Sequence, residues 1–116
     1  MNKLDTVEKF DIVIDGNADF VLTLTIRDED GNLKDLTGCT ATAQLRESPE
    51  SNDYFDFVCT HNDEGGKILI TMSHSETEKI PYTHGVYDVL LETPTEILKL
   101  IYGEAEIIPH VTRNHV

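Results

Sequence analysis

The 116 residues carry 22 aspartates and glutamates against nine lysines and arginines, which gives a formal net charge of −13. Phosphate binding needs clustered basic side chains, so this balance argues against nucleic acid and anionic membrane surfaces as partners. The length predicts one domain whose core is large enough to fold without metal or disulfide.

The sequence shows neither a targeting segment nor a disulfide framework. Its apolar runs are far shorter than the roughly 18 residues that a membrane span requires. Residues 1–5 lack the apolar centre of a signal peptide, so we expect synthesis and folding in a cytoplasm. Cys39 and Cys59 both fall at inward strand positions, and in that compartment we expect two free, buried thiols rather than a disulfide.

Alternating apolar and polar side chains predict the first three strands. Residues 10–15 and 20–26 alternate with period two, and the second run is the cleanest strand signal in the chain. The third strand has the inward set Cys39, Ala41, Ala43 and Leu45 and the outward set Thr40, Thr42, Gln44 and Arg46. Because the two inward alanines are small, we expect Tyr87 or Tyr102 to fill the space opposite them.

An acidic turn at residues 28–32 separates the second and third strands. It resembles a calcium loop, but an EF-hand needs Gly at its sixth position and Glu at its twelfth. Those positions hold Leu33 and Cys39. Asp, Asn and Gly are turn formers in any case, so we interpret the segment as a hairpin turn. Weak calcium binding by Asp28 and Asp30 stays an alternative.

Two more strands follow the exposed loop at residues 47–53. A connecting loop at residues 61–66 predicts three inward pairs, namely Cys59 with Ile68, Phe57 with Ile70 and Phe55 with Met72. Residues 73–79 then predict a single helical turn that crosses between the sheets and ends before Pro81. Its capping box would be Ser73 with Glu76 or Ser75 with Glu78.

The remaining chain predicts a central hairpin made of residues 85–92 and 97–102. Pro94 suits the second position of a type I turn, so the turn at residues 93–96 sets the register. The predicted pairs are Glu92 with Ile97, Leu91 with Leu98, Val89 with Leu100 and Tyr87 with Tyr102. We expect Gly103 to interrupt the last strand as a bulge or bend.

The pattern of about seven short strands with one helical turn predicts an all-β fold. The expected architecture is a two-sheet antiparallel β-sandwich, immunoglobulin-like in size, with a small closed barrel as the alternative. The sandwich would span residues 10–110, between an N-terminal arm at 1–9 and a C-terminal tail at 111–116.

The sequence carries no recognisable catalytic, cofactor or metal constellation. It lacks a nucleophile elbow, a phosphate-cradling glycine loop and a catalytic Cys/His signature. Its five histidines show no metal-ligand spacing with one another or with a cysteine. We therefore expect no catalytic residues, no cofactor, no metal and no small-molecule substrate, and hence no enzyme.

The outer face of the central hairpin is the candidate interface. The predicted register places Leu90 beside Lys99, Ile101 beside Asp88, and Ile97 beside Glu92. A solvated sheet face should be mostly polar, so three large aliphatic side chains there indicate a contact surface. In the alternative reading, the final loop or the N-terminal arm of the same chain covers them.

Several segments in chain order resemble small β-sandwich modules of tailed-bacteriophage virion proteins. They are the acidic Gly-Asn turn, the Asp-Leu-Thr-Gly segment at 35–38, the Gly-Lys-Ile-Leu-Ile run at 66–70, the Ser/Thr/Glu turn at 73–78, and the Gly-x-Tyr-Asp segment at 85–88 before a strand through Gly103. The resemblance covers roughly residues 10–110.

Such modules occur in baseplates, at the attachment ends of tail fibres and as head decoration. The resemblance implies a non-enzymatic adaptor, decoration or attachment subunit of a virion, made in the host cytoplasm. Its implied partners are other virion proteins and copies of itself. The alternative function is a free-standing module that binds a carbohydrate or another ligand.

Overall fold

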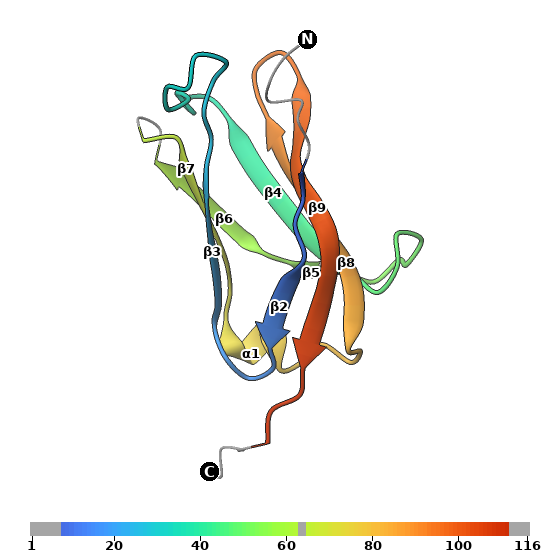
Figure 1. Ribbon diagram of the computed structural model, residues 1–116. Helices are drawn as coiled ribbons and strands as arrows, with labels where there is room; N and C mark the ends of the chain where they lie inside the picture. The colour runs from blue at the N-terminus through green and yellow to red at the C-terminus, as the bar shows by residue number, and fades with distance from the viewer. Residues whose placement is uncertain (1–7, 63–64, 112–116) are drawn as a thin grey trace.

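The computed structural model describes residues 8–62 and 65–111, which form two β-sheets packed face to face (Figure 1). Sheet A contains β1 (Glu8–Lys9), β2 (Ile12–Asp15), β4 (Thr40–Arg46), β5 (Phe55–Asp56), β8 (His84–Glu92) and β9 (Ile97–Ile108). Sheet B contains β3 (Phe20–Thr25), β6 (Val58–Asn62) and β7 (Lys67–Met72). The helical turn α1 (His74–Thr77) joins β7 to β8.

The strand order is β1–β9–β8–β4–β5 in sheet A, where β2 also pairs with β9, and β3–β7–β6 in sheet B. The predicted two-sheet, immunoglobulin-like sandwich with one helical turn is confirmed, and two separate sheets exclude the closed barrel. Among the described strands, β1 and β2 alone depart from the antiparallel pattern, because both run parallel to β9. Of the predicted arm and tail, residues 1–7 and 112–116 lie outside the described residues.

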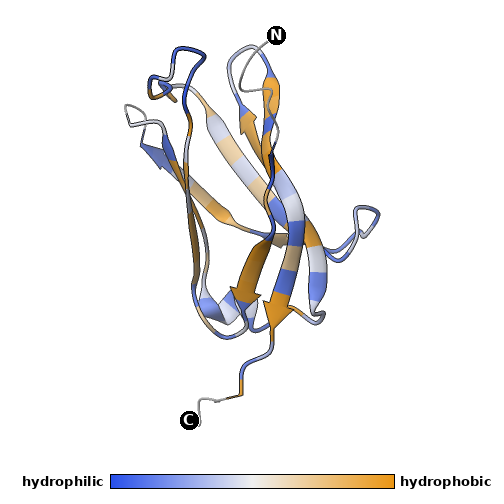
Figure 2. Cartoon of the chain, viewed as in Figure 1, coloured by the Kyte–Doolittle hydropathy of each residue, from blue (hydrophilic) through white to orange (hydrophobic). Residues whose placement is uncertain are grey.

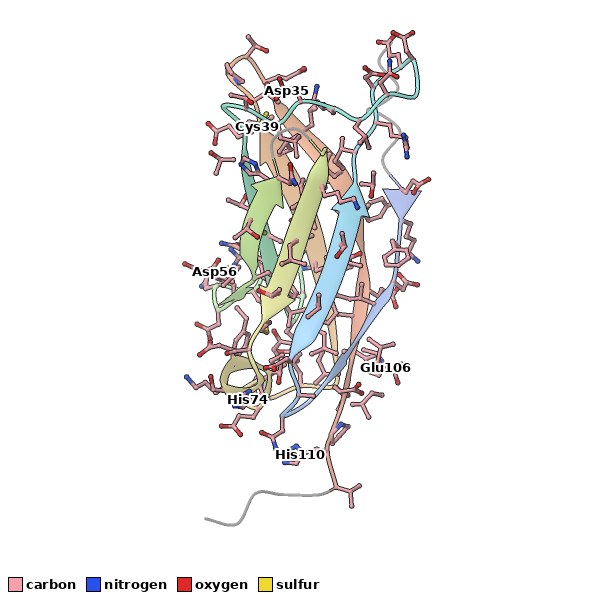
Figure 3. All side chains as sticks on the ribbon, turned by 90° about the vertical axis from the view of Figure 1, so that its left-hand side faces the viewer. Asp35, Cys39, Asp56, His74, Glu106 and His110 are labelled. Carbon is pink, nitrogen blue, oxygen red and sulfur yellow. The ribbon has the colours of Figure 1, made fainter. Side chains whose placement is uncertain are left out.

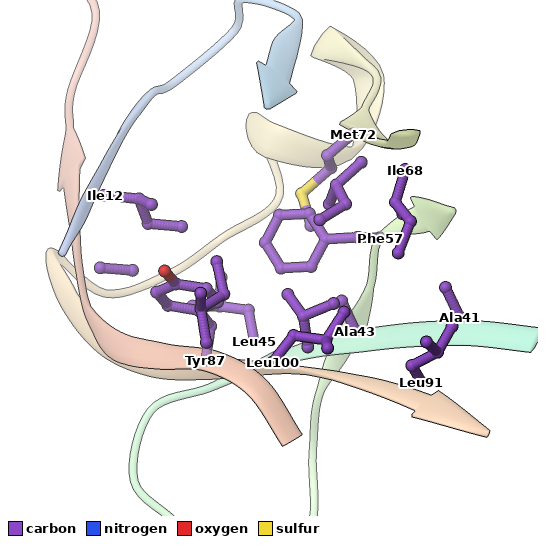
Figure 4. Close-up of a cluster of buried hydrophobic side chains, with 14 of the residues drawn as sticks. Ile12, Ala41, Ala43, Leu45, Phe57, Ile68, Met72, Tyr87, Leu91 and Leu100 are labelled. Atoms are coloured by element: carbon purple, nitrogen blue, oxygen red, sulfur yellow. The ribbon is translucent and has the colours of Figure 1, made fainter. Parts of the chain in front are cut away.

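The core lies between the sheets and follows the predicted alternation. The buried side chains come from alternate positions of β2, β4, β7, β8 and β9. Figure 4 shows Phe57 between Met72 of sheet B and the Ala43 and Leu45 positions of β4. Phe57, and not Tyr87 or Tyr102, therefore occupies the layer over Ala43. Tyr87 pairs with Leu45, the next inward residue of β4 after Ala43, and Tyr102 faces solvent.

The central hairpin keeps the predicted register only next to its turn. Glu92 pairs with Ile97, Leu91 with Leu98 and Leu90 with Lys99. A β-bulge follows, because Val89 pairs with Ile101 and leaves Leu100 as the extra residue. Beyond the bulge, each residue of β8 pairs with the residue of β9 that follows its predicted partner, so Tyr87 pairs with Gly103 and not with Tyr102. The interruption lies at Leu100, and β9 continues unbroken through Gly103.

The predicted fourth strand is split between the two sheets. Phe55 and Asp56 pair with β4 in sheet A, and from Val58 on the chain pairs with β7 in sheet B. The N–H of Phe57 donates to the Ala43 carbonyl at 3.0 Å, which fixes the crossing point. The predicted pairing of Phe55 with Met72 is therefore wrong, and Cys59 pairs with Ile70 rather than Ile68.

Helix α1 is capped from a distant part of the chain. The Ser73 side chain makes no capping hydrogen bond, so the predicted Ser73–Glu76 capping box is wrong. The Asp19 carboxylate instead accepts from the His74 backbone N–H at 2.7 Å. The hydroxyl of buried Thr77 donates to the Ala18 carbonyl at 2.9 Å. Both bonds tie the β2–β3 turn to α1.

The Asp-Leu-Thr-Gly segment has a structural role. The Asp35 carboxylate accepts from the N–H and the hydroxyl of Thr37, and these bonds hold its pKa below the usual range. Leu36 between them is fully buried. Gly38 has a φ of 80°, which favours glycine. The segment therefore forms a turn anchored by one buried leucine before β4 begins.

The N-terminal strand is interrupted where it passes Gly103. The pairing of β1 and β2 with β9 keeps one register on both sides of residues 10 and 11. A Cβ on Gly103 would lie 2.4 Å from the Phe10 carbonyl oxygen, so only glycine allows this approach. The hydroxyl of Tyr87, which pairs with Gly103, donates to that same carbonyl.

Removing the Tyr87 hydroxyl tests this crossing. Tyr87→Phe leaves the Phe10 carbonyl without its donor and should lower the free energy of unfolding by about 1–3 kcal/mol. Tyr102→Phe, fifteen positions later on the exposed face, should change it by less than about 0.5 kcal/mol. Urea denaturation of both variants measures the difference, and equal losses would contradict the role assigned to the hydroxyl.

Alkaline stability gives a second test. Burial, with a smaller effect of Asp11, raises the pKa of Tyr87 to about 12. An unfolded tyrosine ionises near about pH 10, so above that pH only the unfolded state loses the proton. The stabilising contribution is therefore complete below pH 10 and declines as pH rises towards 12. Denaturation from pH 9 to 12 should show a shallower loss in Tyr87→Phe than in the wild type.

Candidate protein-binding face

The outer face of sheet A carries a shallow groove of 580 Å³ over β9, β8 and β4. Its apolar floor includes Val86 and Leu90 of β8, which are half-buried, and Tyr102 of β9, which is 40% exposed. These positions face outward because their neighbours Tyr87, Val89 and Leu91 point into the core. The groove is therefore a hollow on the exposed face and is separate from the interior.

Three basic side chains line this groove, namely Lys9, Arg46 and Lys99, against the two acidic side chains Asp88 and Glu104. The whole chain has only nine lysines and arginines and 22 acidic residues. A third of the basic side chains thus gathers along one hollow, where the basic lining residues outnumber the acidic ones by three to two. Lys9 also lies 3.9 Å from Asp11, which offsets part of this positive charge.

Lys99 stands between an acid and an aromatic ring. Its Nζ lies 3.8 Å from Asp88 Oδ2 and 5.9 Å from the centre of the Tyr102 ring. Both pairs are about half exposed, so the ion pair adds little to stability. An incoming carboxylate competes with Asp88 for Lys99 at small cost. The arrangement suits recognition better than it suits stabilisation of the fold.

Arg46 is held in place at the other side of the groove. One guanidinium nitrogen donates to Gln44 Oε1 at 2.9 Å, and another donates to the Ser51 carbonyl. The guanidinium also lies 4.8 Å from the centre of the Tyr54 ring. Gln44 in turn donates to Asp56 at 3.1 Å. This network orders a long side chain before any partner arrives, which lowers the entropic cost of binding.

The five predicted interface residues are not all brought together. Asp88, Leu90 and Lys99 line the groove, as adjacent outward positions of the hairpin. Ile97 shares that face but lies beyond the groove, beside the turn, and is 65% exposed. Ile101 is wrong as an outward residue, because the bulge at Leu100 turns it inward and leaves it only 7% exposed.

Sequence reasoning missed Lys9, Arg46 and Tyr102 as groove residues. Arg46 was placed on the outward face of its strand, and only the pairing of β4 with β8 brings it beside the hairpin. Lys9 joins the groove through the parallel pairing of β1 with β9, across 93 residues of sequence. Tyr102 was placed inward because no sequence signal marks the bulge at Leu100.

The described residues do not form a calcium site, another metal site or a reactive thiol. Asp28 Oδ1 accepts from the N–H groups of Asp30 and Asn32, as an ordinary turn does. Within residues 8–62 and 65–111, no group of three His, Cys, Asp or Glu side chains could hold a metal ion. Both cysteines are free, as predicted; Cys39 is buried, whereas Cys59 is half-buried. Burial raises the pKa of the Cys59 thiol, which disfavours the nucleophilic thiolate.

The similarities to solved structures are weak, as two examples show. No family model and no curated protein matches the chain. The filamin domain of Lin-41 aligns with a TM-score of 0.47 and 15% identity, over 82% of this chain and 81% of that one. An extracellular fragment of novel immune-type receptor 11 from Ictalurus punctatus, including its stalk region, aligns with a TM-score of 0.38 and 9% identity, over 95% and 90%. No helix among the described residues is long and apolar enough to cross a membrane.

Two of the isoleucines of β9, Ile101 and Ile97, provide a test of the bulge. Ile101→Ala removes buried methyl groups and should cost about 2–5 kcal/mol of unfolding free energy. Ile97→Ala removes the same groups from an exposed site and should cost less than about 0.5 kcal/mol. Chemical denaturation distinguishes them, and similar losses for both variants would contradict the bulged register.

Proposed function

We propose that this chain is a non-enzymatic assembly subunit that binds a partner protein through the groove on the outer face of sheet A. The observation that carries the proposal is the gathering of Lys9, Arg46 and Lys99 around the apolar surface of Leu90 and Tyr102. Tyrosine and arginine are among the residue types that carry most of the binding energy at protein interfaces.

The charge of the groove defines the partner segment. A strongly acidic chain repels other acidic surfaces, but its groove is locally basic. The complementary segment carries one or two carboxylates next to an apolar side chain. Its carboxylates pair with Lys99 and Arg46, and its apolar side chain covers Leu90.

The proposal that the chain acts in a phage virion rests on its sequence. The segments at 28–38, 66–78 and 85–103 resemble β-sandwich modules of tailed-phage virion proteins. This resemblance supports a virion location, manufacture in the host cytoplasm, and partners that are other virion proteins and further copies of this chain. The two structural similarities described above do not bear on this origin.

A second candidate function, carbohydrate binding, is favoured by a different hollow. A cavity of 710 Å³ lies between residues 47–55 and 79–82 and includes Tyr54, Tyr82 and Asn52 in its lining. Sugars stack on aromatic rings and bond to amides, so this lining suits a polyhydroxylated ligand. The Arg46 guanidinium already covers one face of the Tyr54 ring, which leaves only the other face for a sugar.

Particle incorporation tests the leading proposal. Tagged wild type and Leu90→Lys are supplied to host cells that produce the phage, and purified particles are probed for the tag. Leu90→Lys should be lost from particles by about tenfold or more, since it places an unpaired charge in the contact. Val13→Lys is the control, because Val13 is another apolar residue on the outer face of sheet A and lies outside the groove.

Two results would count against a protein-binding groove. One is a wild-type chain that never sediments with particles, and the other is a Leu90→Lys variant that is incorporated like the control. If the wild type binds glycans on an array and Tyr54→Ala abolishes that binding, the carbohydrate function replaces the leading proposal.

A further inference from the structure

Strand β3 forms one edge of sheet B and has no strand on its outer side. It pairs with β7 through six consecutive residues, while the preceding strand β2 turns away to pair with β9. Figure 3 views sheet B from outside and shows β2 diverging from β3 above the turn that joins them. Among the described residues, β3 therefore presents an open hydrogen-bonding edge.

The ladder with β7 shows which backbone groups face that edge. The N–H of Ile26 donates to the Gly66 carbonyl at 2.7 Å, in register with the β3–β7 pairs. Backbone groups in an antiparallel strand point alternately to one side and the other. The N–H and C=O of Val21, Thr23 and Thr25 consequently point away from β7, towards the open edge.

Natural sheets protect such an edge with charged residues, proline, a bulge or a very short strand. Strand β3 reads Phe-Val-Leu-Thr-Leu-Thr and contains neither a charged residue nor proline. Its pairing with β7 shows no register shift. At six residues it is also as long as β7. Within the described strand β3, none of these four devices is present.

The side chains of β3 are also incompletely covered. Its inward residues Phe20, Leu22 and Leu24 remain half-buried, whereas the inward residues of β7 are 2% exposed or less. Apolar area that the sandwich does not bury thus lies along this edge. A strand added beside β3 would cover it.

The outer face of sheet B lacks the acidic charge of the remaining surface. The cross-strand register aligns nine outward residues in three rows, namely Val21–Thr71–Val58, Thr23–Leu69–Thr60 and Thr25–Lys67–Asn62. None is acidic, in a chain with 22 acidic residues. Of the carboxylates labelled in Figure 3, Asp56 and Glu106 belong to strands of sheet A, and Asp35 lies in the segment before β4.

We propose that β3 pairs antiparallel with β3 of a second copy of this chain, across a two-fold axis at Thr23. This register places Thr23 opposite Thr23, Leu22 opposite Leu24 on the inner face, and Val21 opposite Thr25 on the outer face. The outward backbone groups then bond in pairs, and one six-stranded sheet spans both copies. This contact between copies uses sheet B and is independent of the groove on sheet A.

Charge identifies a second copy as the occupant. Two chains of net charge −13 repel each other wherever carboxylates meet. The nine outward residues of sheet B include no carboxylate, so two copies that meet along the β3 edge do not bring carboxylates of this face together. Identical strands also satisfy the two-fold symmetry that most homodimers adopt. A strand from a different protein would need side chains that fit this register independently.

The test compares the two edges of the same sheet. Thr23→Lys puts like charges opposite each other at the axis and should raise the dimer dissociation constant by about tenfold or more. Thr60→Lys is the matched control, because Thr60 lies in the same row and on the same face but on the β6 edge. Sedimentation at increasing concentration measures association, and circular dichroism confirms that both variants fold.

An equimolar mixture of Thr23→Lys and Thr23→Glu should restore association, since opposite charges then meet at the axis. Amide exchange at Thr23 should slow as the wild type associates. The proposal is overturned if the wild type stays monomeric up to about 1 mM, if Thr60→Lys weakens association as much as Thr23→Lys, or if the mixed variants stay apart.

Discussion

The hydrogen bond from the Tyr87 hydroxyl to the Phe10 carbonyl holds together the parts of sheet A that the chain brings from its two ends. It forms over Gly103, where the absence of a side chain lets the N-terminal strand pass against β9. The Asp11 carboxylate accepts from the Glu104 N–H at 3.0 Å on the far side of this crossing. Without this contact, the placement of β1 and β2 would rest on their backbone pairing with β9 and on the Asp11 bond alone.

Much of the fold could be predicted from the sequence because its strands alternate clearly. The inward residues of β2, β4 and β7 follow from period-two patterning. Figure 2 shows such alternation most clearly as changing colours along β9, whereas β2 is coloured hydrophobic almost throughout. Two predictions failed for the same reason, namely the hairpin register beyond Leu100 and the strand pairs on either side of Phe57. A shift of one residue moves every later side chain of a strand to the other face. Neither the extra residue Leu100 nor the change of sheet at Phe57 breaks the apolar pattern.

The candidate site was predictable only in part for a related reason. Asp88, Leu90 and Lys99 are close in sequence, so the hairpin turn alone places them together. Arg46 and Lys9 reach the same hollow through pairings between distant strands, and a single sequence carries no signal for those pairings. The distant cap of α1 by Asp19 has the same origin, because local capping rules consider only neighbouring residues.

The parallel pairing of β2 with β9 also constrains the order in which the chain folds. Ile12 must find Ala105, which is synthesised 93 residues later. Closing so long a loop is slow, and nothing rewards it until both partners exist. On the ribosome β2 therefore waits for nearly the whole domain, whereas the uncharged strand β3 is exposed only until β7 has been made. A nascent chain of this kind depends on its dense negative charge to stay dispersed until the sandwich closes.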